Sequence, residues 1–92
     1  MTTTETPLLR VEVTTSRRDH DTIDIFARLG DDDRVHLGTA FKGLTGYWTA
    51  HVGDDVFSSV RKFEIVLEVC RLAGPKHFTG AVYRYGRYAI EA

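Results

Sequence analysis

The C-terminal segment 83–88 carries three tyrosines and two arginines within six residues. Both residue types are enriched at protein–protein contacts, because they offer a large contact area and hydrogen-bond donors at a modest entropic cost. The same composition suits stacking on single-stranded nucleic acid. In a third interpretation the tyrosines pack in the core and only the arginines are exposed. The partner-binding residues expected here are Tyr83, Arg84, Tyr85, Arg87 and Tyr88.

A second candidate surface is the face of the predicted sheet that the helix does not cover. Aromatic and basic side chains on an open sheet can stack on bases or bind phosphates. Phe26 is expected to lie over Gly38 on this face, which is a structural role. The candidate binding residues on this open face are Arg28, His36, Lys42, Tyr47 and His51, with Arg10, Glu12, Asp24 and Thr49 around them.

The patterns that would indicate catalysis or a metal site are weak. His36 and His51 are predicted to be diagonal neighbours on the open face, but two ligands do not make a metal site. The acidic run 31–33 is typical of a hairpin tip and lacks the spacing of a calcium loop. Ser58 and Ser59 are better explained as helix caps than as nucleophiles. We therefore expect no enzyme activity, no cofactor and no metal.

Alternation of apolar and polar residues predicts the strands that would hold these side chains. Leu9, Val11 and Val13 define a first strand, and three more follow at about 23–29, 35–42 and 47–52. Glycine-containing turns separate the last three. Placing Leu29 opposite Val35 and Lys42 opposite Tyr47 gives a four-stranded antiparallel meander. In this register Phe41 and Trp48 point inward, and Lys42 and Tyr47 point outward.

One amphipathic helix is predicted from Asp54 to Ala73. Its buried stripe would contain Val60, Phe63, Leu67 and Cys70, widened by Val56 and Val66. Gly74 would take the left-handed conformation that ends a helix, and Pro75 would stop it. The aromatic segment after it would add a C-terminal strand. The expected fold is therefore α+β, with the antiparallel four-stranded meander packed on one α-helix and an additional C-terminal strand.

Size and composition limit the class of protein. Ninety-two residues make one domain, assigned here to 8–92 after a flexible N-terminus at 1–7. Twelve basic and thirteen acidic residues give a net charge of −1, so any binding to nucleic acid needs a local patch. The sequence shows no signal peptide and no membrane span, and it has a single cysteine, so we expect a cytoplasmic protein.

The order of sheet, Gly46-Tyr47-Trp48 hairpin and helix resembles the small DNA-binding domains at the start of phage-type tyrosine recombinases. The resemblance covers about residues 22–73 and implies a fold, without transferring any functional residue. The acidic balance and the tyrosine-rich tail depart from that pattern.

Together these features predict a non-catalytic interaction module that binds another protein, with a homodimer as one form. A phage or mobile-element accessory role is part of this hypothesis. The alternative is a nucleic-acid-binding domain that uses the open face and the Tyr/Arg segment, with Arg28, Lys42, Tyr47 and Arg84 as contacts.

Overall fold

The computed structural model describes residues 9–92 of the chain. The predicted flexible N-terminus at 1–7 lies outside the described residues. In chain order the elements are β1 Leu9–Asp19, β2 Thr22–Leu29, β3 Val35–Lys42, β4 Trp48–Val52, β5 Asp55–Ser59, α1 Lys62–Ala73, the 3-10 turn η1 Gly74–Lys76, β6 Ala81–Tyr85 and β7 Tyr88–Glu91.

All seven strands belong to one sheet with the order β5-β4-β3-β2-β1-β6-β7. Neighbouring strands pair antiparallel, except that β6 lies parallel to β1. The sheet is therefore mixed. The expected α+β class with a single α-helix is confirmed. The four-stranded antiparallel meander with one extra strand is not confirmed, because the sheet has seven strands and one parallel pair. Local sequence patterns do not indicate the parallel pair, because β1 and β6 are about 70 positions apart in the sequence.

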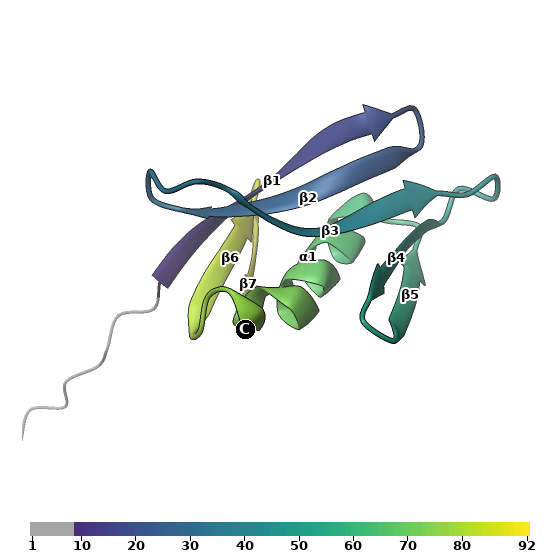
Figure 1. Cartoon of the computed structure of the whole chain (residues 1–92). Helices are drawn as coiled ribbons and strands as arrows, with labels where there is room; N and C mark the ends of the chain where they lie inside the picture. Colours follow the sequence, from purple (N-terminus) through teal and green to yellow (C-terminus); the bar gives the residue numbers. More distant parts are fainter. Residues whose placement is uncertain (1–8) are drawn as a thin grey trace, which may run out of the picture.

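The sheet curls around α1, with β4 and β5 on one side of the helix and β6 and β7 on the other (Figure 1). The curl lets one helix fill the concave face, as a sheet with one apolar face requires. The core is mainly aliphatic and small, and its larger fully buried side chains are Val11, Ile25, Ile65, Val66, Val69, Cys70 and Tyr83.

The helix is shorter than predicted, because residues 55–59 form a strand. Gly53 has φ +59 and turns the chain directly from β4 into β5. The N-cap of α1 is Arg61, which has no side-chain capping bond, so the predicted serine caps are wrong. Ser59 still supports the helix start: its Oγ accepts from the Arg61 N–H and donates to Glu64 Oε2 at 2.8 Å.

The buried stripe of the helix also differs from the prediction. Phe63 and Leu67 are half-buried, and Val60 precedes the helix and is exposed. The predicted stripe was displaced because it began at residues that belong to β5. The side chains that α1 buries are Ile65, Val66, Val69, Cys70 and Ala73.

Gly74 does not take the predicted left-handed conformation. Its φ of −57 is right-handed, and the chain continues into η1. Its glycine identity has another cause: a Cβ at this position would overlap the hydroxyl and ring of Tyr83. The C-terminal strand and the helix end therefore approach each other more closely than a side chain at position 74 allows.

The hairpin registers differ from the prediction: Ala27 pairs with Val35 and not with Leu37, and Lys42 pairs with Trp48 and not with Tyr47. Ile25 pairs with Gly38, and Phe26 pairs with His36, so Leu37 is an extra residue in a β-bulge. Gly38 faces the helix, where a Cβ at this position would lie 3.0 Å from Val69 Cγ1. A bulge moves every later side chain of the strand to the other face, which is why alternation alone failed here.

Candidate functional site

α1 packs on one face of the sheet and leaves the other face without a helix (Figure 1). Ile23, Ile25 and Ala27 of β2 are buried in the same core as the inward side chains of α1. The alternating side chains therefore point to the opposite face. Six of the seven strands contribute the residues of this face that matter here: Arg10, Glu12, Asp24, Phe26, Arg28, His36, Thr39, Phe41, Thr49, His51, Val56, Ser58 and Arg84.

One end of this face, formed by β3, β4 and β5, is apolar. Phe41 is 43% exposed and stacks on His51 at a centroid distance of 6.0 Å, and His51 pairs with Val56 across the strands. Trp48 pairs with Ser59. Tyr47 and Val60 are the next residues in the sequence on either strand, so alternation places them on the opposite face, with His51 and Val56. We call Phe41, Tyr47, His51, Val56 and Val60 the apolar end.

The opposite end, formed by β1, β2 and β6, is basic. Glu12 pairs with Arg28 on one side and with Arg84 on the other, and Arg10 lies two residues away on the same face. All four side chains are exposed. We call Arg10, Arg28 and Arg84 the basic end, because these three cations outnumber the two carboxylates, Glu12 and Glu91, at the neighbouring positions.

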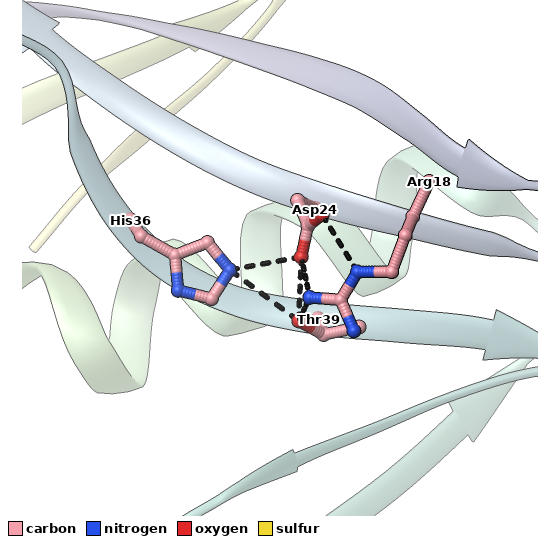
Figure 2. A network of polar contacts seen from close by, with 4 residues as sticks. All are labelled: Arg18, Asp24, His36 and Thr39. Carbon is pink, nitrogen blue, oxygen red and sulfur yellow. Dashed lines mark hydrogen bonds and ion pairs between the residues drawn. The ribbon is translucent and has the colours of Figure 1, made fainter.

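Between the two ends lies a polar network centred on Asp24 (Figure 2). Arg18 Nε donates to Asp24 Oδ2 at 3.0 Å, and Arg18 Nη2 donates to Oδ1. Thr39 Oγ1 donates to Oδ1 at 2.8 Å. His36 Nε2 lies 3.0 Å from the same oxygen. Since a carboxylate only accepts, this nitrogen carries the proton.

The bulge in β1 positions Arg18 for this network. The register shifts between Arg17 and Asp19, which leaves Arg18 as the extra residue beside β2. Mainly through the hydrogen bond from Arg18, and also through those from Thr39 and His36, the pKa of Asp24 falls to about 2. The network thus fixes an ionised carboxylate and holds β1, β2 and β3 together.

The same network is unsuited to nucleophilic catalysis. A hydroxyl, an imidazole and a carboxylate are present, but Thr39 Oγ1 and Asp24 Oδ1 both approach the same nitrogen, His36 Nε2. A relay needs the carboxylate and the hydroxyl on opposite nitrogens of the ring. The geometry therefore indicates a structural role for Asp24.

We expect the Asp24 network to stabilise the protein above about pH 4 and to lose this effect as the pH falls towards about 2. The reason is that the pKa of Asp24 is lower in the folded chain than its ordinary value of 3.8, so protonation favours unfolding. Because Arg18 is largely exposed, Asp24→Asn should reduce the free energy of unfolding by about 1 kcal/mol at neutral pH. Urea unfolding at several pH values measures it.

The difference between wild type and Asp24→Asn should shrink towards zero at low pH. Asp33→Asn, at the exposed tip between β2 and β3, is the matched control and should change little at any pH. A constant difference across the pH range would contradict a role for the ionised carboxylate.

Phe26 has a different neighbour from the one predicted. It contacts His36 edge-on at 5.3 Å, and the guanidinium of Arg34 lies 3.9 Å from its ring centre. The expected packing over Gly38 is wrong because of the bulge at Leu37. Phe26 is half-buried between a cation and an imidazole, so little of its ring is available to a ligand.

The Tyr/Arg segment divides into buried and exposed residues. Tyr83 is fully buried and donates to the Phe78 carbonyl, so its expected partner contact is wrong. Tyr88 stacks on Phe63 of the helix at 3.9 Å, and Tyr85 lies 3.5 Å from Thr15 Oγ1. The side chains that remain exposed are Arg84, in the basic end, and Arg87, whose guanidinium contacts Tyr88.

The residues predicted for the open face do not all lie on it. Lys42 pairs with Trp48 and shares the helix side with Ala40, so its expected place on the open face is wrong. Trp48 packs against the core as expected, whereas Phe41 points outward and not inward.

Three further predicted residues are at different parts of the open face. Arg28 lies in the basic end, His36 in the Asp24 network and His51 in the apolar end. The ring of His36 contacts Phe26, and the ring of His51 stacks on Phe41. Among residues 9–92, no group of three or more potential ligands could hold a metal ion.

Sequence reasoning missed Phe41, Val56 and Val60 as surface residues, since it places Phe41 on the inward face of the sheet and the two valines on the buried stripe of the helix. The available signal was the Gly53-Asp54 pair, which is typical of a tight hairpin turn and would have placed Val56 on a strand.

Within the described part of the chain, neither helix has the length and apolar character needed to cross a bilayer. The chain matches no protein-family model, no curated protein and no solved structure.

Proposed function

We propose that this protein is a non-catalytic module that binds another protein through the helix-free face of its sheet, with the apolar end as the main contact. A phage or mobile-element accessory role in the cytoplasm belongs to the same proposal, and the single unpaired thiol of Cys70 is consistent with a reducing compartment.

The observation that carries the proposal is the concentration of exposed apolar side chains at one end of this face. Val56 and Val60 are 59% and 60% exposed, and Tyr47 is 50% exposed. Leu44, at the adjoining turn between β3 and β4, is completely exposed. Contiguous apolar surface of this kind marks interaction sites in soluble proteins, while single exposed apolar residues do not.

The experiment is affinity capture from an extract of the source organism, with wild type and variants immobilised at equal amounts. Phe41→Ser with Leu44→Ser should reduce the retained partner by about tenfold, the effect of losing a small number of central contacts. Arg87→Ala, on the far edge of the sheet, is the control and should retain the partner. Equal capture by the Phe41 and Leu44 variant would contradict the proposal.

Nucleic-acid binding is the second candidate, and the basic end favours it. Arg10, Arg28 and Arg84 lie at neighbouring positions of an exposed sheet surface that also carries Glu12 and Glu91. Three guanidinium groups so placed form a local patch that phosphates can bind. Affinity for random-sequence DNA and RNA should then fall steeply between about 50 and 200 mM salt. It should also weaken in Arg28→Ala with Arg84→Ala. Absence of binding at low salt would exclude this candidate.

A further inference from the structure

β5 is an edge strand, and its outer side has no paired strand within residues 9–92. It follows β4 through a two-residue turn, so Val52 and Asp55 close the hairpin as a hydrogen-bonded pair. Alternation then directs the backbone groups of Val56, Ser58 and Val60 towards the free edge. Edge strands in soluble proteins are usually protected by lysine, proline or a bulge. β5 contains no lysine and no proline, and its pairing with β4 shows no register shift and therefore no bulge.

The segment around β5 begins with two acidic residues and ends with two basic residues. From position 54 to 62 the order is acid, acid, Val, Phe, Ser, Ser, Val, base, base. An antiparallel pair centred on Ser58 therefore sets acidic residues opposite basic ones and Val56 opposite Val60. The matches are Asp55 with Arg61, Val56 with Val60, Phe57 with Ser59, and Ser58 with itself. Asp54, in the turn before β5, and Lys62, the first residue of α1, add a second acid and a second base at the two ends of the pair.

We propose that β5 pairs antiparallel with β5 of a second copy of this chain, about a two-fold axis at Ser58. A two-fold interface requires a surface that is complementary to itself, because each contact occurs twice. The pairing joins the two sheets into one and brings together Val56 and Val60, which are both more than half exposed in the single chain. The inference rests on the proposed protein-binding role, since it names one partner at the apolar end.

The backbone geometry allows the matched segment to extend beyond β5. Arg61 has φ −106 and ψ 117, so the chain is extended at the residue that precedes the helix. The Arg61 side chain is 66% exposed, and its pair with Glu64 at 3.3 Å is a surface pair. Such a pair contributes little to stability, so the guanidinium is free to contact a carboxylate of another copy. Asp54 and Asp55 are both exposed.

The opposite edge of the sheet is a weaker candidate. β7 could match Arg87 with Glu91 in a similar way, but only one charge pair would form on each side. Tyr88 is already stacked on Phe63, and Ile90 packs against the core. Pairing at β7 would therefore bury little additional apolar surface.

Two charge-reversed variants test the pairing at β5. Asp54→Lys with Asp55→Arg makes both ends of the segment basic, and Arg61→Asp with Lys62→Glu makes both ends acidic. Sedimentation velocity at about 100 µM protein, a concentration that populates complexes of micromolar affinity, should show a dimer for wild type. Each variant alone should associate at least about tenfold more weakly, because like charges then face each other. An equimolar mixture of the two should form a heterodimer.

The acidic variant is expected to remain folded, since aspartate is a favoured N-cap residue and glutamate favours the first turn of a helix. Glu91→Arg, on the β7 edge, is the matched control and should stay dimeric. A monomeric wild type would overturn the inference, and so would dimers of the single-sign variants or dissociation by Glu91→Arg. A monomeric wild type that still captures a partner through Phe41 and Leu44 would leave the proposed function standing, so the two failures are distinguishable.

Discussion

Replacing Tyr83 by alanine is expected to lower the free energy of unfolding by about 3–5 kcal/mol, the range for removal of a large buried aromatic side chain. Tyr83 is the largest fully buried side chain of the described residues. Its hydroxyl donates to the Phe78 carbonyl at 3.0 Å, and its ring fills the space that Gly74 leaves open. Because small domains are stable by only about 5–15 kcal/mol, this change removes a large part of the total.

Thermal and urea unfolding followed by circular dichroism measure this loss. Tyr83→Phe separates the hydroxyl from the ring and should reduce the free energy of unfolding by about 1 kcal/mol, the usual value of one hydrogen bond. Arg84→Ala is the matched control, because its side chain is exposed on the neighbouring position. If Tyr83→Ala kept full stability but no longer captured a partner protein, Tyr83 would be a binding residue, as the sequence alone suggests.

Cys70 is expected to react with a thiol reagent at least about a thousandfold more slowly in the folded chain than in the unfolded chain at pH 8, because only the thiolate reacts. Its side chain is fully buried in the core. Burial raises the pKa of the thiol from 9.0 to about 12, which lowers the fraction of thiolate tenfold for each of three pH units. Limited access of the reagent would slow the reaction further.

A colorimetric thiol assay with and without denaturant measures this difference in rate. The denatured protein should titrate as one thiol per chain, since the sequence has one cysteine. Tyr83→Ala should speed the labelling under native conditions, because it destabilises the core that contains Cys70 and increases the unfolded population. Rapid and complete labelling of the native wild type would contradict the buried position of the thiol.

The α+β class and the existence of most strands could be predicted, because their apolar residues alternate over five or more positions. β2 is the clearest example, since Ile23, Ile25 and Ala27 are all buried as the pattern indicates. The second half of the helix was also predictable, since Val66 and Cys70 are buried on the same side.

The bounds of the helix could not be predicted from apolar spacing alone. Val56, Val60 and Phe63 fit the spacing of a helix, but Val56 and Val60 also fit the alternation of a strand. Short apolar runs are ambiguous in this way, and the turn at Gly53 decided the outcome. The candidate surface changed as a result, because residues assigned to a buried stripe became exposed.

The faces of β3 and the fate of the Tyr/Arg segment depend on contacts that are distant in sequence. The bulge at Leu37 arises where Gly38 meets Val69 of the helix, and local sequence carries no sign of that contact. Likewise, whether Tyr83 points inward depends on the parallel pairing of β6 with β1. Composition can identify tyrosine and arginine as binding residues, but only the strand register decides which of them reaches solvent.

The parallel pairing of β1 with β6 has a consequence for biosynthesis. Leu9 and Ala81 are partners, so β1 gains its second neighbour only after the ribosome has made the strands, the helix and the turn that lie between them. Contacts of such long sequence separation slow folding, because the intervening loop must close first. During translation β1 therefore has one unpaired side, which is where a chaperone would be most useful.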